Sequence, residues 1–169
     1  MATLHLMVGL PCSGKTTTAK KLEKEYNALL LTTDKWHIKL FGNEAIEIEK
    51  DHDKKHERVE EMLWEIAKRV LILGVDVILD FGFWGKAERI YFKDKSKELG
   101  IKFKIHYMNI EKDELYKRLD ERNKELPEGA FRIPKENMDE YIKIFQPVED
   151  DEYLEEIKRN TIGRWHNYT

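Results

Sequence analysis

The fold is decided by the stretch Gly9-Leu10-Pro11-Cys12-Ser13-Gly14-Lys15-Thr16, which fits the phosphate-binding loop pattern G-x-x-x-x-G-K-[ST] at every fixed position. A short apolar run at 4–8 precedes it and predicts a strand, and the residues from 17 to 23 that follow it predict a helix. The two glycines let the backbone bend with its N–H groups pointing inward, toward an anion at the N-terminus of that helix. The loop is therefore predicted to bind phosphate.

The positions of the loop predict separate roles. Lys15 is expected to reach the β- and γ-phosphates of a nucleotide, where it is also a candidate catalytic residue, and Thr16 offers its hydroxyl to Mg²⁺. The alternative is a glycine-containing turn that matches the pattern by accident, and the strand and helix on either side disfavour it. The predicted nucleotide-binding residues are Gly9, Leu10, Pro11, Cys12, Ser13, Gly14, Lys15, Thr16 and Thr17.

Length and composition limit the class of protein. A chain of 169 residues is the size of one domain, so residues 1–169 are predicted to form a single domain. Charged residues make up 37% of the chain but the net charge is only -3, which favours a soluble protein and disfavours nucleic acid or an anionic membrane as its partner. One cysteine excludes an internal disulfide, and we identify neither a signal peptide nor a membrane-spanning apolar run. The protein is predicted to be cytoplasmic.

Strands and helices are predicted to alternate along the chain. Apolar runs at 28–32 and 75–79 and an alternating run at 102–108 predict three further strands. A long amphipathic helix is expected within 44–73, its apolar stripe formed by Val59, Met62, Leu63, Ile66, Val70 and Leu73. Later helices begin near 86, 111 and 134, while 153–157 is either a last strand or a helical turn, and 160–169 either a strand or a loose tail. This order predicts an α/β fold, with a parallel sheet between helices on both faces.

Two carboxylates follow predicted strands and so are expected at the carboxyl edge of the sheet. Asp34 comes just after the second strand, where open α/β sheets bind ligands. It is interpreted either as the general base that accepts a proton from an acceptor hydroxyl or as the N-cap of a following helix. Asp80 ends the third strand, the pattern that holds Mg²⁺ in phosphate-loop enzymes, so Thr16 and Asp80 are the predicted metal ligands.

A pair of histidines is predicted to border the same crevice. The apolar stripe of the long helix, extended backward, passes through His56 and His52, with Asp53 beside them. In a β-α-β unit that helix starts at the end of the sheet that carries the phosphate loop, so these residues are candidates to bind an acceptor. Two alternatives stay open: a zinc pair at i, i+4 spacing, for which no third ligand is evident, and plain surface or capping residues.

Other candidates for binding the acceptor surround these. His37 follows Asp34, Trp84 lies in an aromatic loop at 81–85, and Arg89 lies early in the next helix. Arg118 and Arg122 are i, i+4 neighbours on a helix that breaks at 126–129, so a helical lid is predicted at about 118–135. Because phosphoryl transfer needs cations over the transferring group, both arginines are candidate catalytic residues; the alternative is a solvated helix face.

Taken together, the phosphate loop, Asp34, Asp80, Arg118 and Arg122 resemble the P-loop kinases, or AAA-type ATP-binding proteins, of the zeta-toxin, chloramphenicol phosphotransferase and polynucleotide kinase group. The resemblance covers about residues 1–150. It implies a nucleoside-monophosphate-kinase-like three-layer α/β/α core with strand order 2-3-1-4-5. It also implies ATP as donor and Asp34 as the acceptor-side base.

The expected function is transfer of the ATP γ-phosphoryl group to a hydroxyl of a small-molecule acceptor, with Mg²⁺ as cofactor. Two rival functions stay open: a kinase of 5′-hydroxyl polynucleotide ends, and a nucleotide-dependent ATPase or switch with a protein partner. Neither the acceptor nor the oligomeric state follows from the sequence.

Overall fold

Four parallel strands form one twisted sheet in the order β2-β3-β1-β4. The computed structural model describes residues 1–42 and 51–152. The strands are β1 (Thr3–Val8), β2 (Leu29–Thr32), β3 (Val77–Gly82) and β4 (Lys102–Tyr107). Their order matches the first four positions of the expected 2-3-1-4-5. No fifth strand occurs in these ranges, and 153–157, one interpretation of which was a strand, lies outside them.

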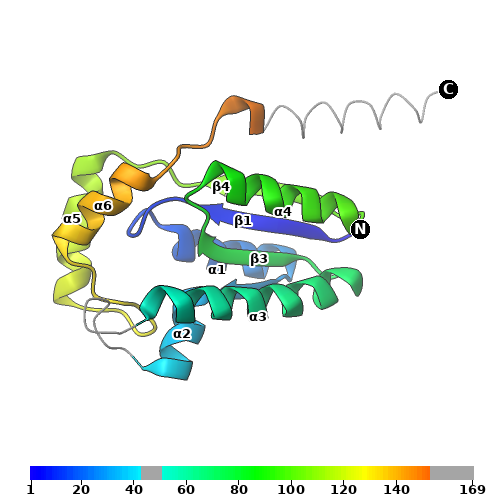
Figure 1. Cartoon of the computed structure of the whole chain (residues 1–169), viewed down its shortest axis with the longest axis horizontal. Coiled ribbons are helices and arrows are strands. Elements are labelled where there is room, and N and C mark those ends of the chain that lie inside the picture. The colour runs from blue at the N-terminus through cyan, green and yellow to red at the C-terminus, as the bar shows by residue number, and fades with distance from the viewer. Residues whose placement is uncertain (43–50, 153–169) are drawn as a thin grey trace.

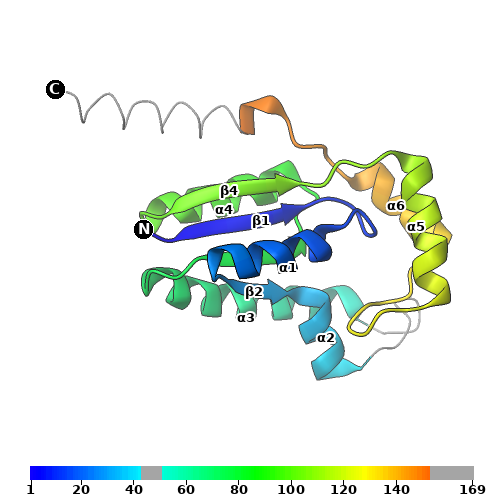
Figure 2. The same cartoon turned by 180° about the vertical axis from the view of Figure 1, so that it is seen from behind.

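Helices cover both faces of the sheet and stand over its carboxyl edge (Figures 1 and 2). One face carries α1, the other carries α3 and α4, and α5 and α6 lie together beyond the strand ends. The phosphate loop therefore opens toward the α5–α6 pair. The bounds are α1 (Lys15–Tyr26), α2 (Thr33–Phe41), α3 (His52–Ile72), α4 (Lys86–Glu98), α5 (Lys112–Lys124) and α6 (Lys135–Ile144).

The predicted apolar stripe of α3 is rotated from the one observed. Four buried positions recur every fourth residue from Val59 to Leu71, and Trp64 adjoins one of them. The buried stripe therefore follows the sheet along this part of the helix. Met62, Ile66 and Leu73 are instead exposed, because they lie on the flank that faces away from β2 and β3. The buried side chains of α3 are Val59, Leu63, Trp64, Ala67 and Leu71.

Strand β3 extends past Asp80, its predicted last residue, to Gly82. Asp80 pairs with Thr32 of β2, and Gly82 pairs with Val8 of β1 and accepts a hydrogen bond from the Gly9 N–H at 3.1 Å. Asp80 is a strand residue with 6% of its surface exposed. This pairing ties the end of β3 to the start of the phosphate loop.

The segment predicted as a lid forms a second small core. Leu119 of α5, Ile133 of the loop before α6, and Met138 of α6 are buried together, and Cys12 of the phosphate loop packs against them. Asn123 of α5 holds the loop before α6: its side-chain amide N–H donates to the Ile133 carbonyl, and its amide oxygen accepts from the Ile133 N–H. Phe131 lies in the same loop. The α5–α6 pair thus contacts the phosphate loop directly. No helix in the described ranges has the length and apolar character needed to span a membrane.

Candidate functional site

The loop between β1 and α1 requires glycine at its first position. Gly9 has a φ of +149°, and a Cβ there would lie 2.8 Å from Ser13 Oγ and 2.9 Å from the Met108 carbonyl oxygen. Trp84 closes this end of the loop, since its indole N–H donates to the Gly9 carbonyl at 3.1 Å. Gly14, at a φ of +94°, precedes α1, so the N-terminal amides of α1 open into the loop.

Lys15, Thr16 and Asp80 meet at the mouth of this loop. The Lys15 ammonium donates to the Leu10 carbonyl at 2.8 Å, and burial lowers its pKa, opposed by the charges of Asp80 and Asp34. Thr16 Oγ1 donates to Asp80 Oδ2 at 2.6 Å. Burial raises the pKa of Asp80, against the hydrogen bond of Thr16 and the charge of Lys15. The predicted metal pair is therefore in direct contact.

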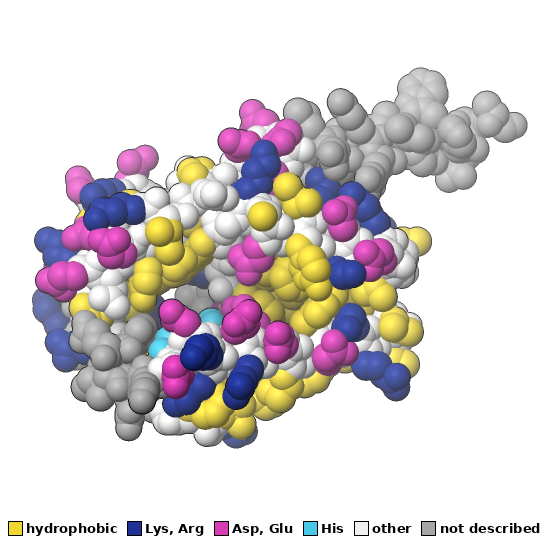
Figure 3. Space-filling model, viewed as in Figure 1, with side chains coloured by type: hydrophobic (Ala, Val, Ile, Leu, Met, Phe, Trp, Pro, Cys, Tyr) yellow, Lys and Arg dark blue, Asp and Glu magenta, His cyan; other side chains and the backbone are white. Residues whose placement is uncertain are grey.

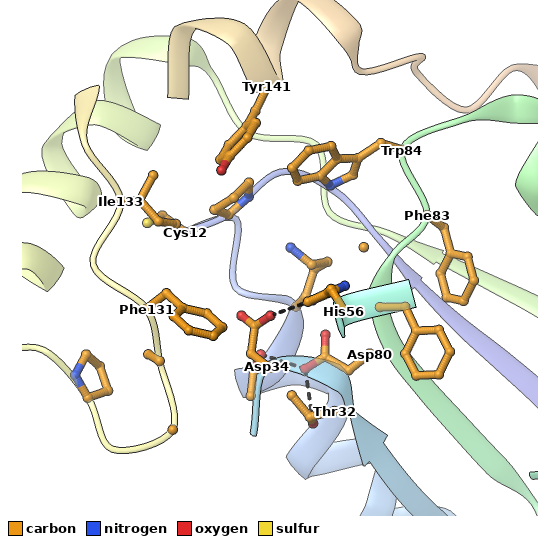
Figure 4. A pocket seen from close by; sticks show the side chains of 18 of the residues that line it. Cys12, Thr32, Asp34, His56, Asp80, Phe83, Trp84, Phe131, Ile133 and Tyr141 are labelled. Atoms are coloured by element: carbon orange, nitrogen blue, oxygen red, sulfur yellow. Dashed lines mark hydrogen bonds and ion pairs between the residues drawn. The ribbon is translucent and has the colours of Figure 1, made fainter. Parts of the chain in front are cut away.

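Asp34 lies in the first turn of α2 and forms a pair with His56 of α3. His56 Nε2 lies 3.2 Å from Asp34 Oδ1 (Figure 4). On its other side, His56 Nδ1 lies 3.4 Å from Glu60 Oε1. Burial works against a charged imidazole, but the two carboxylates outweigh it and raise the pKa of His56 to about 9. Burial likewise works to raise the pKa of Asp34, yet His56, Lys15 and Arg122 hold it below its ordinary value. At neutral pH Asp34 is an anion that faces an imidazolium.

The two predicted lid arginines approach the loop from α5. Arg118 Nη1 lies 3.9 Å from the place a Cβ on Gly14 would take, and its Nε donates to Glu114 at 2.7 Å. Arg122 donates to the carbonyl of Phe131 at 3.0 Å and lies 3.8 Å from the Cys12 sulfur. Both guanidinium groups are thus available at the side of the loop where a nucleotide would lie.

These groups border one cavity of about 760 Å³ between the sheet edge, α3 and the α5–α6 pair. The close view shows Asp34, His56 and Asp80 on one side and Trp84 and Tyr141 on the other (Figure 4). Of the predicted loop residues, Gly9, Leu10 and Ser13 form the base of the loop and do not line the space. The predicted residues that do are Pro11, Cys12, Gly14, Lys15, Thr16, Thr17, Asp34, His52, Asp53, His56, Asp80, Trp84, Arg118 and Arg122.

The structure corrects the prediction that Arg89 binds an acceptor. Its side chain has no exposed surface, and two of its nitrogens donate to Glu152 at 2.7 and 2.8 Å. It also donates to four backbone carbonyls, those of Phe83, Trp84, Gln146 and Pro147. A guanidinium with this many protein partners has no donor to offer a ligand. Arg89 instead fastens the chain after α6 onto α4.

His37 also differs from its predicted place, because it does not line the cavity. It is fully buried, and its ring lies 4.6 Å from that of His52 and 5.3 Å from that of Phe131, centroid to centroid. Since α2 begins directly after β2, Asp34 opens toward the cavity while His37, one turn later, lies behind His52. His37 therefore supports the histidine pair from the interior.

Sequence reasoning missed four carboxylates that line the cavity: Glu57, Glu60, Glu88 and Glu128. Glu60 continues the i, i+4 series of His52 and His56, so the spacing alone could have identified it. Glu88 lies in the first turn of α4, just beyond the aromatic loop, which puts it at the same edge of the sheet. Burial and the charge of Glu60 raise the pKa of Glu88 to about 7. In the described ranges, no three potential ligands are placed to hold a metal ion, which leaves the zinc alternative without support.

Comparison with known proteins agrees with this geometry. Residues 4–148 match the sequence profile of the AAA domain, which is most of the chain. The chain belongs to the AAA domain family. Among curated protein sequences, none matches it.

Solved structures place this AAA domain among P-loop kinase folds. It superposes on a protein named as a candidate kinase from Chloroflexus aurantiacus, with a TM-score of 0.68, 17% identity, and coverage of 88% of this chain and 83% of the other. It also matches Chaetomium thermophilum Kti12 in complex with ADP-AlF3, with a TM-score of 0.66, 19% identity, and coverage of 86% of this chain and 81% of the other. A sugar kinase from Janibacter sp. HTCC2649 matches with a TM-score of 0.63, 16% identity, and coverage of 89% of this chain and 81% of the other. At these identities the likeness establishes the fold.

Proposed function

We propose that this AAA domain is a kinase that transfers the γ-phosphoryl group of ATP to a hydroxyl of a small molecule. The observation that carries the proposal is the position of Asp34, which lines the same cavity as the phosphate loop and is electrostatically coupled to Lys15. A bare ATPase needs no enclosed space for a second substrate beside such a carboxylate. The cavity of about 760 Å³ has room for both substrates.

Phosphate binding falls to the loop and α5. The amides of the loop and the N-terminus of α1 bind the phosphates, and Lys15 exchanges the Leu10 carbonyl for their oxygens. Arg118 and Arg122 neutralise charge on the transferring group from the opposite side. Kti12, which has the same fold, was solved in complex with ADP-AlF3, and this supports a nucleotide as the ligand.

Mg²⁺ fits the donors that Thr16 and Asp80 offer. A hydroxyl and one carboxylate, 2.6 Å apart, are the oxygen ligands that Mg²⁺ takes from proteins when phosphates and water supply the remainder. When bound, the ion would neutralise charge on the phosphates.

Asp34 is the base in this proposal. The acceptor hydroxyl donates a hydrogen bond to the carboxylate, and its proton passes to Asp34 as the oxygen forms its bond to phosphorus and the bond to the ADP oxygen breaks. His56, held by Glu60 on its other side, keeps Asp34 ionised and fixes its orientation. The lowered pKa keeps Asp34 in the ionised form, which is the form that can accept the proton.

The test is a screen for phosphorylated metabolites with labelled ATP, run with the wild type and with Asp34→Asn. We expect the variant to bind Mg-ATP as the wild type does and to lose transfer by about 10²–10⁴-fold, the usual contribution of a general base. Asp120→Asn, on the exposed side of α5, is the matched control and should behave as the wild type. Undiminished phosphoryl transfer by Asp34→Asn would show that Asp34 is not the base and serves only the helix. Weakened binding of Mg-ATP by the variant would show that Asp34 belongs to the nucleotide site.

A further inference from the structure

The charges that line the cavity divide between two groups of helices. Among the described residues, its lysines and arginines all come from the phosphate-loop helix α1 and from α5: Lys15, Lys20, Arg118 and Arg122. Asp80 belongs to the proposed Mg²⁺ site. The other carboxylates come from α2, α3, α4 and the loop before α6: Asp34, Asp53, Glu57, Glu60, Glu88 and Glu128. Acidic side chains gather over α3 beside a hollow in which histidines are visible (Figure 3).

This division has a consequence for the acceptor. ATP and Mg²⁺ would bind on the side of α1 and α5, where the lysines and arginines can pair with the phosphates. The acceptor is left with the space beside α3 and α4, where lysine and arginine are absent from the described lining. The His56 imidazolium on this side is already paired with Asp34 and Glu60, so a phosphate or carboxylate on the acceptor would face mostly like charge there and an anionic acceptor is disfavoured.

Glu60 and Glu88 are the carboxylates of the cavity lining that a bound cation would stabilise most. Glu60 contacts His56, but none of the ion pairs within the described residues includes Glu88, which is half-buried and feels the charge of Glu60. Two carboxylates that share a partly buried space repel each other, and a cation between them relieves the repulsion. The protein supplies the His56 imidazolium to Glu60, but among the described residues it gives Glu88 no ion-pair partner.

Aromatic rings line the same cavity and favour an organic cation. Phe81, Trp84 and Tyr141 border the space, and the rings of Trp84 and Tyr141 lie 4.7 Å apart, centroid to centroid (Figure 4). Phe83 stacks on Phe81 at 5.5 Å but is itself buried in the core. The faces of such rings attract ammonium groups, and their carbon surface packs against a carbon skeleton. Carboxylates beside aromatic rings are therefore suited to a protonated amine more than to a neutral sugar.

We infer that the acceptor is a hydroxyl compound that carries a protonated amine, an amino sugar or an amino alcohol, whose ammonium binds between Glu60 and Glu88 while its hydroxyl faces Asp34. This inference rests on the proposed kinase function and names its substrate class. It also separates the protein from a kinase of polynucleotide ends, whose substrate would bring phosphates to the acidic side of the cavity.

The test uses acceptors of related skeleton that differ in charge. Glucosamine, N-acetylglucosamine and glucuronate form one set; ethanolamine and N-acetylethanolamine form another. Transfer from labelled ATP and binding by calorimetry are measured for each. We expect the amines to have a kcat/KM higher by about tenfold or more than their acetylated partners, which corresponds to one desolvated charge contact. Preference for an acetylated or anionic member would overturn the inference.

Glu88→Gln tests the assigned contact, with Glu61→Gln as the control that removes the same charge from the exposed flank of α3. Glu88→Gln should raise the KM of the amine by about tenfold or more while changing that of the acetylated partner little, and Glu61→Gln should change neither. An equal rise for both partners would show a structural effect and refute the ammonium contact.

The two proposals fail separately. If an uncharged or acidic member is phosphorylated in preference to the amines, the kinase function stands and the amine inference falls. If neither this set nor the metabolite screen yields a phosphorylated product although Mg-ATP binds, the kinase function fails. Calorimetry then still decides the cation site: amine binding that Glu88→Gln abolishes supports it, and no amine binding overturns it.

Discussion

Replacing His56 with glutamine should destabilise the protein in a pH-dependent way. The imidazole contacts Asp34 at 3.2 Å and Glu60 at 3.4 Å, and its pKa stands at about 9 against an ordinary 6.5. Glutamine can keep one of these hydrogen bonds but not the charge. The loss of that charge is therefore the quantity that the substitution measures.

The magnitude follows from the pKa. A rise from 6.5 to about 9 corresponds to roughly 3 kcal/mol in favour of the protonated imidazole. The side chain of Asp34 is 45% exposed, so solvent screens part of the attraction, and we expect roughly 1–2 kcal/mol. Because the pKa in the folded state lies above that of the unfolded chain, this contribution is complete below pH 6.5 and is lost as the pH rises through 9.

Urea unfolding followed by tryptophan fluorescence provides the assay. At pH 6, His56→Gln should unfold with about 1–2 kcal/mol less free energy than the wild type, and at pH 9.5 the difference should fall to a few tenths. Comparing the two proteins at each pH cancels the titration of other groups. A double-mutant cycle that combines His56→Gln with Asp34→Asn should show a larger coupling energy between the two side chains at pH 6 than at pH 9.5. An equal loss at both pH values would refute the reasoning and reduce His56 to a packing residue.

Three other substitutions or modifications test the remaining parts. Lys15→Ala should abolish ATP-dependent transfer and weaken nucleotide binding by about a hundredfold or more while the fold is kept, and calorimetry with unchanged affinity would count against the loop assignment. Alkylation of Cys12, which is half-buried in the loop beside Arg122, should block nucleotide binding, and Mg-ATP should protect it; equal alkylation rates with and without Mg-ATP would contradict this. Arg89→Met should cost about 3–5 kcal/mol of stability, because it leaves Glu152 as a buried carboxylate without its partner. Unchanged urea unfolding of that variant, with weaker acceptor binding, would restore Arg89 to the acceptor side.

The strands and the position of the loop could be predicted because they depend on local patterns, whereas the order of the strands in the sheet was implied only by the family resemblance. An apolar run, a glycine-bounded loop and a helix occur consecutively in the first 26 residues, and each is read from neighbours in the chain. The places of Asp34 and Asp80 followed from the rule that parallel strands end at one edge. The start of α3 at His52 also matched the backward extension of its periodicity.

Charge alone misled the prediction for Arg89. Its place early in α4 suggested a cation at the crevice, yet its partner Glu152 lies 63 residues later. No local pattern relates the two, and burial of the guanidinium became favourable only when the chain after α6 returned to α4. The same limit applies to His37, whose direction depended on α2 beginning without an intervening loop.

By itself the sequence determined that this protein binds phosphate on a parallel α/β sheet, because glycine conformations and apolar spacing act over a few residues. Only the tertiary structure decided which groups act on each other. It joined His56 to Asp34 and Glu60, brought Arg122 to Cys12, and placed Glu60 of α3 and Glu88 of α4 on the lining of one cavity. Hydrogen bonds act over about 3 Å and screened charge interactions over roughly 10 Å, so both are set by the packing of distant segments rather than by order along the chain.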